Sequence, residues 1–107
     1  MIQGGAIQSV NVPSISDEIG NDNHNYNGTI AMGNTGAPNS ASSQFFINVA
    51  DNNNLYPTFD TNYAVFGKVI GGMDVVMRIS QVPVTTSDPN SPQPVQDVTL
   101  IRAIVLS

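Results

Sequence analysis

The stretch ASSQFFINVA, residues 41–50, decides how the rest of the chain is interpreted. After two phenylalanines, apolar and polar residues alternate, which is typical of a β-strand with one buried face. A strand that only fills a core has no need of Gln44 directly before these aromatic rings. Gln44 and Phe46 are two residues apart, so they share one face of the strand. The stretch is therefore either a core strand with an unusual amide or one wall of a binding groove.

Outward from this strand, short apolar segments are separated by glycines, prolines and asparagines, which indicates a mainly β chain. We expect strands within residues 1–3, 28–34, 43–50, 63–70 and 95–107 and loops at 6–27, 34–43, 51–62 and 85–94. One face of the last strand would carry Val98, Leu100, Ile104 and Leu106. A single helix is expected near residues 72–81, because Met73, Val76, Met77 and Ser80 recur at helical spacing before Pro83. This order predicts one domain over residues 1–107, a barrel or sandwich with an appended helix.

Composition excludes several classes of function. The 107 residues carry a net charge of −5 and only three basic side chains, while thirteen asparagines help to make the surface polar. A nucleic-acid partner needs clustered Lys and Arg, so none is expected. The absence of cysteine excludes disulfides, thiolate zinc sites and a cysteine nucleophile. We find neither a signal peptide nor an apolar run that could span a bilayer, so we expect a soluble protein, periplasmic or cytoplasmic, without a membrane partner.

Other candidate sites have simpler explanations. The segment 23–28 alternates oxygen-bearing residues before a glycine like a calcium loop, but Asn34 stands where the closing glutamate belongs, so a solvated turn is favoured. His24 is the only histidine, and we expect a surface residue rather than part of a catalytic triad. Pro89 and Pro92 form a P-x-x-P match that a stiff turn explains, and Asn27 begins a glycosylation sequon. We therefore expect no metal and no cofactor.

Polar residues at the ends of apolar strands are more informative. Gln3, Asn34 and Gln44 each lie beside Gly, Ser or Phe. A buried amide without a hydrogen-bond partner costs about 1–3 kcal/mol, so three such residues indicate a groove that offers donors and acceptors to an extended peptide. Phe46 or Met1 would supply its apolar pocket. The alternative is that neighbouring loops satisfy these amides.

At these residues the chain resembles the cyclophilin family of peptidyl-prolyl cis-trans isomerases, its bacterial periplasmic-type members above all. The motifs MIQGG, GTIAMGNTGAPNSASSQFFINVAD and NYAVFGKVIGGMDVVMRISQVPV occur in the family's order and cover nearly the whole chain. The resemblance implies an antiparallel β-barrel of eight strands, capped by helices, with a groove for X-Pro segments. It implies that the groove is lined by Met1, Gln3, Phe46 and Leu55, with Phe46 as the floor and Gln3 and Gln44 as the polar wall. It further assigns peptide-backbone pairing to Gly33, Asn34 and Thr35, and a rim position to Tyr63.

Two departures from the family limit this transfer. Asn54 stands where an aromatic residue is usual, which should weaken packing at the pocket edge and the binding of cyclosporin-class ligands. In the family, two strands, a helix and then an FHRVI-type stretch precede the MIQGG segment. The arginine of that stretch is the family's main catalytic residue. Nothing in this chain corresponds to that stretch, and neither Arg78 nor Arg102 has its context. The resemblance therefore leaves the catalytic residue unknown and predicts an incomplete or rearranged barrel that lacks the N-terminal third of the family domain.

Three interpretations remain open. The chain is an isomerase that acts on proline-containing peptides or unfolded proteins and assists protein folding. Alternatively, it is a catalytically weak or inactive module that binds proline peptides. The third interpretation is a truncated fragment that needs a partner. Two missing strands would expose two barrel edges, and self-association or an N-terminal complement would then cover them. A strand from residues 6–27 is a further candidate cover, although this segment is a poor strand former.

Overall fold

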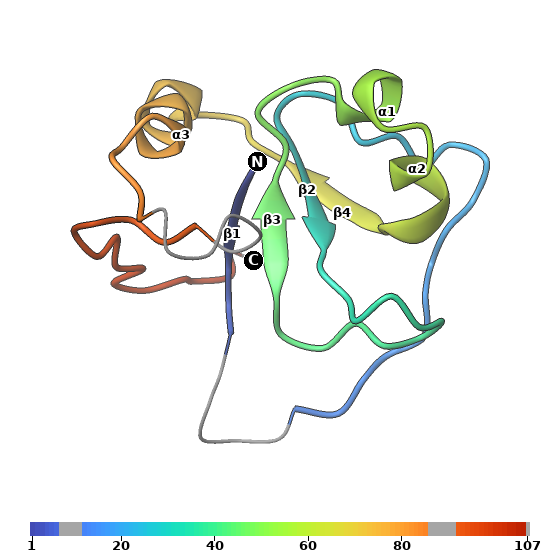
Figure 1. Ribbon diagram of the computed structural model, residues 1–107. Coiled ribbons are helices and arrows are strands. Elements are labelled where there is room, and N and C mark those ends of the chain that lie inside the picture. The colour runs from blue at the N-terminus through green and yellow to red at the C-terminus, as the bar shows by residue number, and fades with distance from the viewer. Residues whose placement is uncertain (7–11, 86–91, 107) are drawn as a thin grey trace.

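The computed structural model describes residues 1–6, 12–85 and 92–106. Four short strands form one antiparallel sheet: β1 (Ile2–Gly4), β2 (Thr29–Met32), β3 (Phe45–Ile47) and β4 (Val65–Lys68). Their order across the sheet is β1-β3-β2-β4 (Figure 1). The mainly β fold class is thereby confirmed, and β2, β3 and β4 lie within ranges that the sequence pattern predicts as strands. β1 extends one residue beyond its range.

The register of the sheet decides which residues share a face. Phe46 on β3 lies opposite Gln3 on β1 and Ala31 on β2. Residues directly opposite one another in an antiparallel sheet point to the same side, so these three form a row across the sheet. Ala31 and Phe46 are buried, at 0% and 2% exposure. A second row, on the other face, contains Ile2, Ile47 and Ile30, all of them half-buried.

Residues 51–62 were expected to form a loop, and this prediction is wrong. Two helices of four residues each occur there, α1 (Asn52–Leu55) and α2 (Phe59–Asn62). Both lie beyond the β2–β4 side of the sheet (Figure 1). A helix of four residues is too short to display a 3.6-residue period, so the sequence pattern cannot reveal it. Such short helices also need tertiary support, and here the buried side chain of Asn52 donates a hydrogen bond of 2.7 Å to Asn48 Oδ1.

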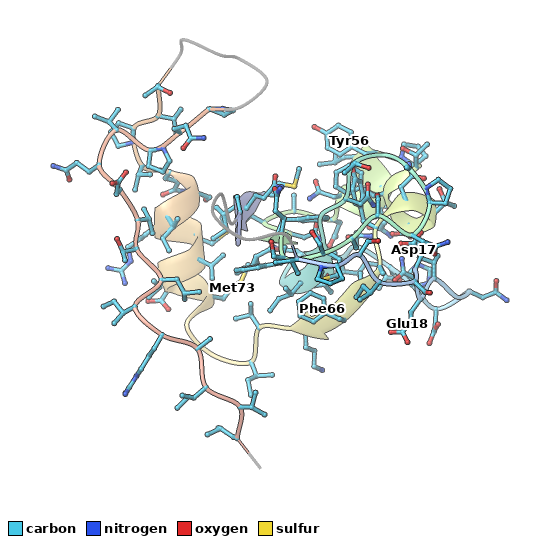
Figure 2. All side chains as sticks on the ribbon, turned by 90° about the horizontal axis from the view of Figure 1, so that it is seen from below. Asp17, Glu18, Tyr56, Phe66 and Met73 are labelled. Carbon is cyan, nitrogen blue, oxygen red and sulfur yellow. The ribbon has the colours of Figure 1, made fainter. Side chains whose placement is uncertain are left out.

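The predicted helix near residues 72–81 is confirmed as α3 (Met73–Ser80). Val76 is buried and Met73, Met77 and Ser80 are half-buried, as their spacing predicts. α3 contacts β1 and lies at the opposite end of the sheet from α1 and α2 (Figures 1 and 2). Across residues 1–6, 12–85 and 92–106, no helix is long and apolar enough to cross a membrane.

The sheet does not close into a barrel. Among the described residues, β1 and β4 are its two edges, and each lacks a neighbouring strand on its outer side. Phe66 on β4 is 61% exposed and Ile70 just beyond it is 93% exposed. Figure 2 labels Phe66. This open arrangement confirms the expectation of an incomplete barrel. The described part of the segment proposed as a cover, residues 12–27, contributes only an isolated bridge between Ile15 and Ala41.

The strand expected over residues 95–107 does not form in its described part, residues 95–106. A bridge between Val84 and Pro94 is the nearest strand-like pairing, and residues 95–106 adopt no regular structure. Leu100 is 70% exposed and Leu106 is 86% exposed. The sheet has two free edges, β1 and β4, but the described part of this segment pairs with neither. Apolar alternation without a ladder of hydrogen bonds to a neighbouring strand does not form a strand. The P-x-x-P match that begins at Pro89 lies partly outside the described residues.

Candidate functional site

The two glutamines expected to form the polar wall of the groove contact each other directly. Gln3 Nε2 donates a hydrogen bond of 2.8 Å to Gln44 Oε1, which links β1 to the residue before β3. Both side chains are exposed, so their remaining donors and acceptors face solvent. A Cβ atom on Gly33 would lie 3.3 Å from both Gln3 Nε2 and Gln44 Cβ. The absence of a side chain at Gly33 therefore leaves room for this amide pair.

An aromatic cluster lies beside the amide pair. Phe46 packs edge-on against Tyr63, with ring centroids 5.3 Å apart, and against Phe59, with centroids 6.0 Å apart. Phe59 and Tyr63 are four residues apart across α2, and their centroids are 4.9 Å apart. Edge-to-face pairs of this kind each contribute about 0.5–1.5 kcal/mol beyond area burial. Phe46 is thus a buried anchor whose ring is already covered in part by α2.

Two residues expected to line the same pocket are placed at the surface. Met1 is 55% exposed and Leu55, at the end of α1, is 63% exposed. Apolar side chains with this exposure are available to a ligand, but they do not form an enclosed pocket over Phe46. The role of Phe46 as a pocket floor stays a prediction, as do the roles of Met1 and Leu55.

The segment Gly33–Thr35 follows β2 and continues past the amide pair. Its backbone is tied to the neighbouring chain, because Gly33 N donates to Gln44 O at 2.9 Å. The side chain of Asn34 is engaged at both ends: its Nδ2 donates to Asn62 O at 2.7 Å and its Oδ1 accepts from Gly36 N at 2.9 Å. Asn34 therefore joins the turn after β2 to the end of α2. Pairing of this segment with a peptide backbone stays a prediction.

A cavity of about 220 Å³ opens between this turn and α2. Asn34 and Tyr63, two of the residues expected to contact a peptide, line it together with Asp17 and Thr61. Its walls are mainly polar. The cavity is smaller than the 300–1,000 Å³ of typical sites for drug-sized ligands, so it fits one side chain rather than a whole small molecule.

The loop at residues 23–25 holds α2 in place, which sequence reasoning missed. Asn23 Nδ2 donates to the carbonyl oxygens of Asp60 and Tyr63 at 2.8 and 2.9 Å, and its Oδ1 accepts from Val65 N at 2.8 Å. Asn25 is fully buried, and its backbone N–H donates to Asp60 Oδ1 at 2.7 Å. The expectation of a solvated turn is therefore wrong for Asn23 and Asn25. These contacts fix α2, and with it the rings of the aromatic cluster.

His24 is also oriented by this contact, contrary to the expectation of an unsupported surface residue. Its Nδ1 lies 2.9 Å from Asp60 Oδ2, and its ring stacks at a tilt on Tyr26, with centroids 5.2 Å apart. Burial pushes the pKa of Asp60 up, but the hydrogen bonds from His24 and Asn25 outweigh this effect, so that the pKa lies below its ordinary value. In the described part of the chain no serine hydroxyl bonds to His24. No cluster of three or more metal-binding side chains occurs there either.

The basic side chains lie on other elements. Lys68 ends β4, Arg78 lies on α3 and Arg102 lies in the segment after Pro94. The guanidinium of Arg78 is 3.7 Å from the carboxylate of Asp74, and both side chains are highly exposed. Neither Lys nor Arg lines the cavity beside Asn34. The structure therefore gives no reason to assign a catalytic role to Arg78 or Arg102.

Comparison with known proteins identifies relatives for nearly the whole chain. A family model described as "Cyclophilin type peptidyl-prolyl cis-trans isomerase/CLD" matches residues 1–105. A peptidyl-prolyl cis-trans isomerase of Acinetobacter baylyi is 46% identical over 113 residues, and peptidyl-prolyl cis-trans isomerase A of Dickeya dadantii is 40% identical over 112. These alignments cover 100% and 99% of this chain but only 60% and 59% of the relatives, so the chain spans about three fifths of their length.

A solved structure agrees with the sequence matches. The crystal structure of a cyclophilin-type peptidyl-prolyl cis-trans isomerase from Cryptosporidium parvum superposes with a TM-score of 0.61 at 28% identity. The superposition covers 74% of this chain and 49% of that structure. The two proteins therefore share the arrangement of strands and helices over most of the chain described above.

Proposed function

Because this chain belongs to the cyclophilin-type peptidyl-prolyl cis-trans isomerase family, we propose that it binds X-Pro segments of peptides or unfolded proteins and assists their cis-trans isomerisation during folding. The observation that carries this proposal is the contact between Gln3 and Gln44 beside the buried Phe46. It joins an amide wall to an aromatic anchor on one face of the sheet. A peptide at this wall would find both hydrogen-bonding groups and an apolar surface.

The reaction makes modest chemical demands. An X-Pro bond rotates over a barrier of about 20 kcal/mol, which takes tens of seconds or more without a catalyst. No covalent bond is broken, so the protein must only bind the twisted amide better than the planar one. An apolar surface helps, because the planar amide is the more polar form and loses more when water is removed. In this chain the half-buried Tyr63, which packs edge-on against the buried Phe46, would supply such a surface.

Hydrogen bonds would fix the peptide while the amide twists. The exposed amides of Gln3 and Gln44 offer free donors and acceptors. In the segment Gly33–Thr35 the N–H groups of Gly33 and Thr35 already donate within the protein, so this segment would offer its carbonyl oxygens. Such contacts hold the chain on both sides of the rotating bond, which lowers the entropy lost on reaching the transition state. A cation that donates to the proline nitrogen would add further stabilisation, and we assign that role to no residue of this chain.

A second function is favoured by the position of the basic residues. Arg78 pairs with Asp74 on α3, and Arg102 lies in an exposed segment, so neither is associated with the amide pair. Loss of a preorganised donor typically costs about 2.7–4 kcal/mol in catalysis. The alternative is therefore a module that binds proline peptides with little or no turnover, or one that turns over only with a partner.

Two measurements on the purified chain separate these functions. Exchange NMR on an Ala-Pro peptide measures the isomerisation rate, and titration of the same peptide measures its affinity. Acceleration above the uncatalysed rate supports the isomerase. Binding at the background rate supports the module, and absence of both contradicts the proposed function. The Arg78→Gln variant, which removes one positive charge, should change neither result, because Arg78 is exposed on α3.

A further inference from the structure

The cavity beside Asn34 carries one negative charge that the groove described above does not use. Asp17 lines this cavity from a segment outside the sheet, together with Asn34, Thr61 and Tyr63. Neither Lys nor Arg lines it. The ion pairs among the described residues are His24–Asp60 and Arg78–Asp74, so within them Asp17 has no counter-ion.

Two hydrogen bonds with Asn39 hold Asp17 in position. Its backbone N–H donates to Asn39 Oδ1 at 2.8 Å, and its Oδ2 accepts from Asn39 N at 2.9 Å. Two residues earlier, Ile15 N donates to Ala41 O at 2.8 Å. This double contact holds the segment against the turn after β2. In the described residues no hydrogen bond reaches Oδ1 of Asp17, so this oxygen is available as an acceptor.

Several of the other polar groups of the cavity are acceptors or are already engaged. Asn34 uses both ends of its amide inside the protein. The hydroxyl of Thr61 donates to Thr58 O at 3.0 Å, which leaves its oxygen lone pairs free. The carbonyl of Asn62 accepts one hydrogen bond and has a second lone pair. A half-buried carboxylate surrounded by free acceptors matches a side chain that only donates, which is the chemistry of Lys and Arg.

We infer that this cavity is an acidic subsite that takes the Lys or Arg side chain of a residue flanking the proline in the bound peptide. The inference rests on the proposed function, because Asn34 and Tyr63 belong both to the cavity and to the expected peptide groove. The size of about 220 Å³ suits a single side chain. The net charge of −5 also favours approach of a cationic peptide.

The test compares peptides that share one X-Pro core and differ only in a flanking residue. Lys is placed at successive positions on either side of the proline, and matched peptides carry Gln or Glu instead. Affinity is measured by fluorescence anisotropy at low salt. At one flanking position the Lys peptide should bind about two- to fivefold more tightly than the Gln peptide, as expected for a partly exposed ion pair. The Glu peptide should bind more weakly than both, and added salt should reduce the differences.

Variants assign the preference to one carboxylate. Asp17→Asn keeps an oxygen for the bond to Asn39 N, and it should abolish the preference for Lys. Asp17→Glu retains the charge and should preserve part of it. Glu18→Gln is the matched control: it removes the same charge one residue away, outside this cavity, and should leave the preference intact. Thermal melting of each variant verifies that it is folded.

Each outcome bears on the inference. If the Lys and Gln peptides bind wild type equally well, the acidic subsite is wrong while peptide binding stands. A preference that survives in Asp17→Asn contradicts the assignment to Asp17. Failure of every peptide to bind overturns the proposed function together with the subsite.

Discussion

His24 Nδ1 lies 2.9 Å from Oδ2 of Asp60, a residue 36 positions later in the chain. The other carboxylate oxygen, Oδ1, accepts the backbone N–H of Asn25 at 2.7 Å. A single carboxylate at the start of α2 therefore binds two consecutive residues of the loop before β2. Since α2 carries Phe59 and precedes Tyr63, this contact supports the aromatic cluster around Phe46.

The Asp60 contact should make stability depend on pH. The pKa of Asp60 is lowered in the folded protein, because hydrogen bonds from His24 and Asn25 exceed the opposing effect of burial. Its contribution is therefore fully present above the unfolded value of about 3.8 and is lost as the pH falls through the lower folded value. Asp60→Asn should reduce the free energy of unfolding by about 1.5–3 kcal/mol at neutral pH. The difference from wild type should shrink in acid, as measured by urea denaturation.

Asp22→Asn serves as the control for this prediction. Asp22 lies in the same loop and is exposed, so removing its charge should change the free energy of unfolding by no more than about 0.5 kcal/mol. A difference between wild type and Asp60→Asn that stays constant from neutral to acidic pH would contradict the assigned role of the carboxylate.

The sequence predicts the sheet well because alternation and turn residues act locally. Gln44 and Phe46 share a face, as their spacing indicates, and α3 matches its helical period. The support of α2 was not predictable in the same way, because Asn23 and Asn25 look like loop residues until their partners near Asp60 are known. An asparagine-rich segment is read as solvated on composition alone. Only tertiary contacts reveal that its amides are buried.

The expected strand after Pro94 illustrates the opposite error. Val98 and Leu100 have the alternation of a strand, yet they are 49% and 70% exposed. The local pattern indicates which side chains a segment would bury if it were paired, and it does not indicate whether the segment pairs with an edge of the sheet. For the site, spacing places Gln44 and Phe46 on one face, and the contact of Gln44 with Gln3 depends on the register of β1 and β3. That register is not visible in either segment alone.

Removal of the Asn23 side chain should destabilise the fold strongly. Its amide satisfies two carbonyls near α2 and the N–H of Val65, so Asn23→Ala leaves Asp60 O and Val65 N without partners and Tyr63 O with only the 3.3 Å bond from Asn25 Nδ2. We expect a loss of about 2–4 kcal/mol in the free energy of unfolding, measured by chemical denaturation. Asn53→Ala is the matched comparison, because Asn53 Oδ1 is buried without a hydrogen bond in the described structure. It should be neutral or stabilising by up to about 1 kcal/mol, since alanine also favours helix. Equal losses in both variants would contradict the argument.

Two glycines with similar backbone angles should respond differently to alanine. Gly5 has φ +85°, and a Cβ there would lie 2.3 Å from the carbonyl oxygen of Ser43. Gly36 has φ +95°, with nothing within 4 Å of such an atom. Gly36→Ala should therefore cost only backbone strain, about 1–2 kcal/mol. Gly5→Ala adds a clash with main chain and should cost about 2–5 kcal/mol. Thermal unfolding of the two variants compares them directly, and similar melting temperatures would disprove the close approach at Gly5.

Gln44→Leu separates peptide recognition from stability. The hydrogen bond between Gln44 and Gln3 is exposed, so its loss should change the free energy of unfolding by less than about 1 kcal/mol. The affinity for an X-Pro peptide should nevertheless fall about three- to tenfold, because leucine offers no donor or acceptor to the peptide backbone. Gln81→Leu is the control, since Gln81 is equally exposed but follows α3, away from the amide pair. Titration of one peptide into wild type and both variants measures the effect. If Gln44→Leu binds as tightly as Gln81→Leu, the amide pair is not part of the groove, and the peptide site must be sought on another face of the sheet.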